Sequence, residues 1–453
     1  MVGPAIQGFI TIASIPVGFV GVLGSLGVRE KIVKEKEISE EYKQGMLAFI
    51  LLTSFLLFII SLFISFIIAW FYKTNFSFDY LLKYGFLISA IVPIVIMNHY
   101  FESFQTRDLN FKALSIINFI SLVVGVSVAI AVAYMGNGYL ALSLKMVIPH
   151  LVNLILYVLY FKPSLKFRWM PEMYRSFKSF STYLTLNNIA NYFVRNIDYL
   201  IIGKVFSADI LGQYAIAYKI LLFPMKNVTS RIQAVAMPML SKLVVMSDDF
   251  KKKYSMIIGL VAFVVFPMMA YVVVTADVWV PLSFNSKYNL LIEMITILAI
   301  VGTFQSLVSP VGTLYLLTES TKLMFRNSII NSIVIALVFL ISSLSKDIFI
   351  VLGSYAVSWL VLIMPISMYW IYREHQMKIS AFFFTIAPAF ISISLALAVL
   401  YAYKSFGIFN AYIVIDLIVS FIILVAVYLA GYHFINKAED KSLKFYYNLI
   451  RGK

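Results

Sequence analysis

The chain has 453 residues, of which 62% are hydrophobic and 13% are charged, with a formal net charge of +15 and no cysteine. A soluble domain has about 45–50% apolar and about 25% charged residues, so this composition excludes a soluble protein. Apolar runs of about 18 residues or more recur along the sequence and predict an all-α, multi-pass membrane protein. The basic balance is typical of Lys and Arg on cytoplasmic loops, so nucleic acid is not expected as a partner.

In chain order, the apolar runs predict about thirteen transmembrane helices joined by short connections. Their lengths suit a hydrocarbon core about 30 Å thick at a rise of about 1.5 Å per residue. The expected spans are 3–24, 45–72, 83–102, 114–135, 139–161, 180–203, 213–240, 254–279, 291–318, 325–344, 348–372, 380–402 and 410–436. Apart from Pro4 near the start of the first span, nine prolines fall inside these spans and are candidate hinges.

The connections are too short to hold a catalytic domain, whose usual size is about 50–250 residues. Glycine-rich nucleotide loops and His clusters with metal-ligand spacing do not occur in the sequence. We therefore expect a protein that is not an enzyme and that has no cofactor or bound metal.

The distribution of basic residues predicts the orientation of the chain. One alternate set of connections and the C-terminal tail hold 25 of the 36 Lys and Arg, and the other set holds six. The first set, which includes residues 28–44 and 437–453, is therefore expected on the cytoplasmic side. With thirteen spans Met1 would then lie outside, although the first segment does not resemble a secretory signal. We therefore expect one further helix to precede Met1.

Two spans, 180–203 and 213–240, are much more polar than the others. A charged side chain at the centre of a spanning helix costs about 2.5–3.5 kcal/mol, so several of them require an explanation. The spacing of Asn188, Asn191, Arg195 and Asp198 places these four residues on one helical face. The second span holds Lys219, Lys226 and Arg231, and a further cation, Lys145, lies in the span 139–161.

These cations have two interpretations. Arg195 and Asp198 are three residues apart and could form an ion pair that only stabilises the helices. The remaining cations exceed the intramembrane carboxylates, chiefly Asp198, Glu293 and Asp416, which favours a water-filled cavity with an anionic ligand. The cavity is favoured most for Lys226 and Arg231, whereas Lys145 could equally extend to the interface.

The same polar region carries the motifs of a known family. They are Arg195-Asn196-Ile197-Asp198, Ile202-Gly203-Lys204, Gly212-Gln213-Tyr214, Tyr218-Lys219, Pro224 and Met237-Pro238-Met239-Leu240. The segment SFQTRDLNFK at 103–112 and Gly-Asn-Gly-Tyr at 136–139 also fit. With these motifs the chain resembles the polysaccharide exporters, the Wzx-type flippases of lipid-linked oligosaccharides.

The resemblance implies a fold of fourteen helices, in two six-helix lobes with two appended helices, of which this chain lacks the first. The corresponding regions are an N-terminal lobe at 1–161, a C-terminal lobe at 162–372 and the appended helices at 373–453. It also implies transport of an undecaprenyl-pyrophosphate-linked oligosaccharide by alternating access across the bacterial cytoplasmic membrane. Such a flippase works with membrane lipid around it and with a possible polysaccharide polymerase complex.

Combined with this resemblance, the charge pattern yields a set of expected site residues. The expected substrate-binding residues are Arg195, Lys226, Arg231, Lys219, Asn188, Asn191 and Lys145. Asp198 and Glu293 are candidates for a proton or Na⁺ site, since an ion gradient would have to drive uphill transport. One alternative is a multidrug or metabolite antiporter of the same superfamily, although a carrier of organic cations should line its cavity with acids. Another is a membrane glycan polymerase or ligase, which would need a large outer loop.

Overall fold

The computed structural model describes residues 3–24, 32, 38–161, 166, 168, 170, 192, 195–284, 287–405 and 413–436. Within these residues the secondary structure is helical and contains no strand. The first helices are α1 (Pro4–Gly24), α3 (Glu40–Phe71), α4 (Phe78–Ser89), α5 (Ile91–Arg107), α6 (Phe111–Tyr134) and α7 (Gly138–Phe161). Residues 195–205 are also helical.

The second half of the chain continues in the same way. Its elements are α9 (Ala208–Pro224), η1 (Met225–Thr229), α10 (Ser230–Ser241), α11 (Asp248–Val274), α12 (Ala276–Ser283), α13 (Leu291–Val308), α14 (Pro310–Leu317), α15 (Thr321–Ser343), α16 (Ile348–Ser358), η2 (Trp359–Ile363), α17 (Met364–Glu374), α18 (Ile379–Ser405) and α19 (Ile413–Asn436). The elements η1 and η2 are single π-helical turns inside longer helices.

Eleven helices of the described residues are long and apolar enough to span a membrane, which confirms the predicted multi-pass, all-α class. They correspond one to one with eleven of the thirteen expected spans. The other two expected spans are the polar pair. Span 180–203 lies mostly outside the described residues, and span 213–240 lies within the continuous helix Ala208–Ser241.

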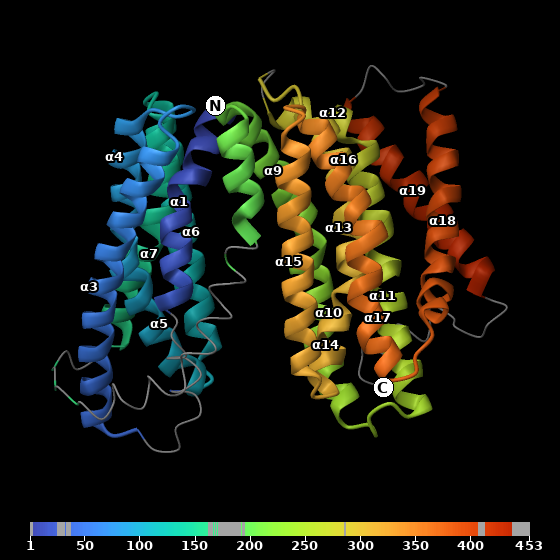
Figure 1. Cartoon of the computed structure of the whole chain (residues 1–453), viewed down its shortest axis with the longest axis horizontal. Coiled ribbons are helices and arrows are strands. Elements are labelled where there is room, and N and C mark those ends of the chain that lie inside the picture. The colour runs from blue at the N-terminus through green and yellow to red at the C-terminus, as the bar shows by residue number, and fades with distance from the viewer. Residues whose placement is uncertain are drawn as a thin grey trace. The chain divides into compact units, whose positions relative to one another are not determined.

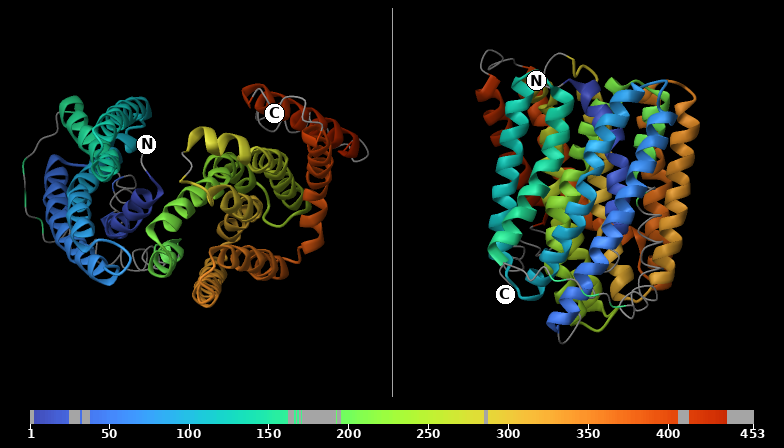
Figure 2. Two further views of the ribbon diagram at one scale, coloured as in Figure 1. Left: turned by 90° about the horizontal axis from the view of Figure 1, so that it is seen from above. Right: turned by 90° about the vertical axis from the view of Figure 1, so that its left-hand side faces the viewer.

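The chain divides into two compact units, Met1–Ala215 and Ile216–Lys453. In the first unit α3 packs against α1, α4 and α5, and α6 forms a close antiparallel pair with α7 (Figure 1). The view from above in Figure 2 shows these helices nearly end on, as expected for a bundle that crosses a membrane. The boundaries expected at 161 and 372 stay predictions.

Small residues allow the helices of the first unit to approach closely. Ser61, Ser65 and Ser89 join α3 to α4 through buried hydroxyl contacts of 2.8 and 3.1 Å. At a second contact, a side chain on Gly8 of α1 or on Gly212 of α9 would collide with the backbone of the other helix. Close contacts between small residues are a common way to join helices in lipid, where the hydrophobic effect contributes little.

In the second unit, the hairpin of α18 and α19 packs on α11, which in turn contacts α13. Tyr428 of α19 donates a hydrogen bond of 2.9 Å to the carbonyl of Phe263 in α11. Tyr271 of α11 donates one of 3.0 Å to the carbonyl of Leu417. The last two helices are thus attached to the unit through α11.

Some of the prolines that are candidate hinges interrupt their helices, and others do not. Pro93 and Pro310 lie at the breaks between α4 and α5 and between α13 and α14, and Pro224 directly precedes η1. Pro365 follows η2, whose π turn gives room to a ring that would clash with the carbonyl four residues earlier. Pro16 stays inside a continuous helix. Hinge motion at the interrupted positions remains a prediction.

The predicted orientation can be tested with two matched serine-to-cysteine substitutions in this cysteine-free chain. Ser241 and Ser345 are exposed and follow helices that run in opposite directions, so we expect them on opposite sides of the membrane. A membrane-impermeant maleimide should label Ser345→Cys on intact cells and Ser241→Cys only after permeabilisation. Labelling of Ser241→Cys on intact cells would invert the predicted topology.

Candidate functional site

The polar segment 195–241 is helical except for a short break near Ser207. Four of the predicted site residues, Arg195, Lys219, Lys226 and Arg231, lie on it, and all four have exposed side chains. Cationic side chains on membrane helices are costly unless water, an anion or the lipid headgroups surround them.

Arg195 and Asp198 do not form the ion pair that their spacing allows. Asp198 is 4% exposed, and it accepts hydrogen bonds from the Tyr214 hydroxyl at 2.7 Å and from the Tyr199 amide at 2.8 Å. The Tyr214 bond attaches the helix at 195–205 to α9. Among the described residues no ion pair involves Arg195, Lys226 or Arg231. The charges of these three side chains are therefore not neutralised by a carboxylate of the described residues.

Lys226 and Arg231 lie where the long helix is least regular. Lys226 is inside the π turn η1, directly after Pro224, and the Ser230 hydroxyl donates to its carbonyl oxygen. A single π turn inside an α-helix is often found at functional sites. Arg231 lies at a groove of about 230 Å³ whose other walls are apolar residues of α10 and α11: Ile232, Val235, Ala236, Met239, Ile257 and Leu260. The site thus presents a guanidinium next to an apolar surface.

The remaining predicted residues are distributed more widely. Lys145 is exposed in the second turn of α7, and Glu293 is exposed in the first turn of α13. Glu293 therefore lies at a helix end, where a carboxylate interacts favourably with the helix dipole. Asn188 and Asn191 lie outside the described residues. Their roles in binding stay predictions.

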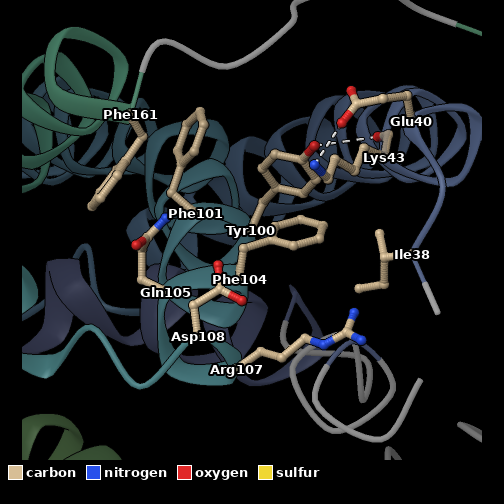
Figure 3. A pocket seen from close by; sticks show the side chains of 10 residues that line it. All are labelled: Ile38, Glu40, Lys43, Tyr100, Phe101, Phe104, Gln105, Arg107, Asp108 and Phe161. Atoms are coloured by element: carbon tan, nitrogen blue, oxygen red, sulfur yellow. Dashed lines mark hydrogen bonds and ion pairs between the residues drawn. The ribbon is translucent and has the colours of Figure 1, made fainter. Parts of the chain in front are cut away.

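A polar cavity of the first unit lies where α3 begins and α5 and α7 end (Figure 3). It has a volume of about 590 Å³. Its walls combine charged and amide side chains with aromatic rings: Ile38, Glu40, Lys43, Tyr100, Phe101, Phe104, Gln105, Arg107, Asp108 and Phe161. Such a mixture can contact a ligand that has both polar groups and apolar faces.

Two polar contacts order one wall of this cavity. Lys43 donates to Glu40 at 2.6 Å, and the Tyr100 hydroxyl donates to the carbonyl of Lys43 at 3.2 Å. The sequence does not distinguish these residues as a site, because charged residues are common in the connections at helix ends. The segment at 103–112, one of the motifs of the family resemblance, contains Gln105, Arg107 and Asp108 and could have indicated this cavity.

Residues 1–293 of the chain match the sequence profile of the family described as "Polysaccharide biosynthesis protein". The chain belongs to this polysaccharide biosynthesis protein family. The predicted family resemblance is thereby confirmed.

Three curated relatives belong to bacterial glycan systems by name. The chain is 22% identical over 330 residues to the lipopolysaccharide biosynthesis protein WzxC of Escherichia coli K12, and 23% identical over 313 residues to the teichuronic acid biosynthesis protein TuaB of Bacillus subtilis 168. It is 22% identical over 339 residues to an uncharacterized membrane protein in the cps region of Klebsiella pneumoniae. These matches cover 70%, 68% and 72% of this chain and 64%, 63% and 67% of the relatives. The chain thus spans about two thirds of their length.

Two solved structures have a similar fold. The lipid II flippase MurJ, in an inward closed conformation, superposes with a TM-score of 0.74 at 14% identity, covering 96% of this chain and 94% of MurJ. An inward-facing multidrug resistance transporter of the MATE family superposes with a TM-score of 0.63 at 11% identity, covering 83% and 91%. At these identities the similarity shows the fold, a multi-helix exporter fold, as predicted.

Proposed function

We propose that this chain is a flippase that moves a lipid-linked oligosaccharide across the bacterial cytoplasmic membrane by alternating access. The observation that carries the proposal is the set of exposed cations on the 195–241 segment, in a member of the polysaccharide biosynthesis protein family with an exporter fold. A lipid-linked glycan has a pyrophosphate, a polar glycan and a long apolar tail. Cations can bind the pyrophosphate, and the guanidinium of Arg can hold two phosphate oxygens at once.

Two further surfaces, one within each unit, suit the same kind of substrate. The groove beside Arg231 offers apolar surface next to a cation, as a phosphate attached to a lipid tail requires. The cavity of the first unit offers aromatic rings and polar groups for sugar rings. Export by an antiporter of organic cations is less well supported, because the exposed charges of the segment are positive. We further propose that the protein does no covalent chemistry and that its C-terminus is cytoplasmic.

Reconstitution of the full chain in vesicles tests the proposal directly. Vesicles carry a polyprenyl-pyrophosphate disaccharide with a fluorescent nitrobenzoxadiazole label in both leaflets, and dithionite is added outside. Dithionite bleaches only the outer leaflet, so protein-free vesicles should keep half of the fluorescence, whereas vesicles with this protein should lose nearly all of it. A labelled phosphatidylcholine serves as a control and should stay half protected. Equal protection of the oligosaccharide lipid with and without the protein would refute the proposal.

A further inference from the structure

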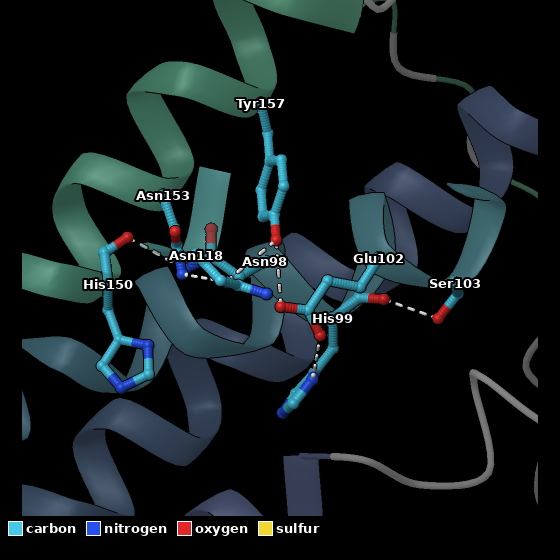
Figure 4. Close-up of polar contacts among 8 residues, drawn as sticks. All are labelled: Asn98, His99, Glu102, Ser103, Asn118, His150, Asn153 and Tyr157. Atoms are coloured by element: carbon cyan, nitrogen blue, oxygen red, sulfur yellow. Dashed lines mark hydrogen bonds and ion pairs between the residues drawn. The ribbon is translucent and has the colours of Figure 1, made fainter. Parts of the chain in front are cut away.

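A second polar cluster lies inside the first unit, between α5, α6 and α7 (Figure 4). Its members are Asn98, His99 and Glu102 of α5, Asn118 of α6, and His150, Asn153 and Tyr157 of α7. The bounding helices α6 and α7 expose large apolar side chains, as lipid-facing helices do, whereas α5 exposes none. The polar residues of α5 are therefore shielded from lipid by their neighbours.

The cluster is held together by hydrogen bonds whose acceptors are all oxygen atoms. The Tyr157 hydroxyl lies 3.2 Å from Oε1 of Glu102 and 3.5 Å from Oδ1 of Asn118. The Asn153 amide donates to the same Asn118 oxygen at 2.9 Å, and the Asn98 amide donates to the carbonyl of His150 at 2.9 Å. The Tyr157 hydroxyl is near both acceptors, so a carboxylate, an amide and a hydroxyl oxygen lie close together in the cluster.

Two other oxygens of the cluster have no hydrogen-bond donor among the residues that the structure describes. They are Oδ1 of Asn98 and Oδ1 of Asn153, on side chains that are 2% and 8% exposed. Among the described residues, only one other buried side-chain amide oxygen, that of Asn331, lacks a hydrogen-bond donor. A buried acceptor without a donor costs about 1–3 kcal/mol, so two of them in one cluster call for a bound group. That group has to interact favourably with oxygen lone pairs.

We propose that this cluster is a binding site for a monovalent cation of the Na⁺ type. Carboxylate, amide, carbonyl and hydroxyl oxygens are the ligands that hard cations prefer, and transporters often hold Na⁺ with such groups. Glu102 supplies negative charge, and the unpartnered oxygens of Asn98 and Asn153 supply lone pairs.

Part of the cluster is also accessible from outside the unit. Asn118 is exposed, and the side chains of His99 and Glu102 are 42% and 27% exposed, with 3.6 Å between His99 Nδ1 and Glu102 Oε2. A cation can therefore reach the cluster while Asn98 and Tyr157 stay buried. If the chain is the flippase proposed above, this cation is the coupling ion, and the cluster takes the role that the sequence predicted for Asp198 or Glu293. Only that role rests on the proposed function, whereas binding itself does not.

The test measures binding to the purified full chain without any oligosaccharide. We expect ²²Na⁺ to bind with a saturable isotherm that unlabelled Na⁺ competes and choline does not. Glu102→Gln should weaken binding at least tenfold. Tyr157→Phe, which keeps the ring that packs in the core, should weaken it less. Asp79→Asn, which neutralises an exposed carboxylate in the first turn of α4, is the matched control and should bind like the parent.

The outcomes separate this proposal from the proposed function. Absence of saturable ²²Na⁺ binding, or equal binding by the parent, Glu102→Gln and Tyr157→Phe, would overturn the cation site. A bound proton alone would appear as pH-dependent stability without Na⁺ binding and would overturn it as well. Loss of binding in folded Glu102→Gln supports the site even if the vesicle assay shows no flipping. Flipping without Na⁺ binding would support the proposed flippase function and overturn the cation site.

Discussion

Among the glycine-to-alanine substitutions, each of which adds one methyl group, Gly212→Ala is expected to destabilise the protein most. A side-chain carbon at Gly212 would lie 1.8 Å from the carbonyl oxygen of Pro4, and one at Gly8 would lie 2.0 Å from that of Ala208. Neither neighbour is a flexible side chain, so α1 and α9 would have to separate. Overpacking typically costs about 1–3 kcal/mol, and a clash with backbone belongs at the upper end of that range. We expect a melting temperature several degrees lower in detergent and less protein in the membrane.

Gly21→Ala is the matched control, because it adds the same methyl group to α1, the helix that Gly212 of α9 contacts, with nothing within 4 Å of it. Alanine also favours helix over glycine by about 0.8–1.0 kcal/mol, so this variant should be as stable as the parent or more stable. Equal melting temperatures for Gly212→Ala and Gly21→Ala would show that α1 and α9 do not approach as closely as described.

Neutralising the cations of the polar segment is expected to abolish most export while leaving the protein folded. Arg195→Gln, Lys226→Gln and Arg231→Gln each remove an exposed charge that has no ion-pair partner among the described residues. No buried carboxylate is stranded, so membrane abundance should change little. A charge-assisted hydrogen bond contributes about 1.5–3 kcal/mol, which corresponds to roughly tenfold to a hundredfold in binding of the anion.

Lys226→Arg keeps the positive charge and is the conservative comparison for Lys226→Gln. It should retain more export than the neutral variant, since binding of a phosphate by charge survives the change. The experiment measures membrane abundance and surface glycan in the same cells. Normal export by all three neutral variants at normal abundance would show that these cations do not bind the substrate. A parallel fall of abundance and export would instead assign them a structural role.

Several features of this protein followed from the sequence because they depend on local or summed properties. Length and hydropathy of each run decide whether a helix can span lipid, so eleven of the expected spans appear as helices of sufficient length and apolarity. The polar pair 180–203 and 213–240 was recognised because charge within an apolar run is costly wherever the run lies. The motifs near Arg195 indicated the family because each of them is a contiguous stretch of sequence.

Other features required the tertiary structure, because they depend on which atoms meet across helices. Spacing alone allowed an Arg195–Asp198 pair, whereas the fold brings Tyr214 to Asp198 and leaves Arg195 exposed. His99 and His150 lie 51 positions apart in the sequence, but helix packing places His99 beside Glu102 and brings the carbonyl of His150 to Asn98. Hydropathy sums over side chains in sequence order and contains no information about such contacts. Only the packing of α5, α6 and α7 decides which oxygens gather and which of them lack a donor.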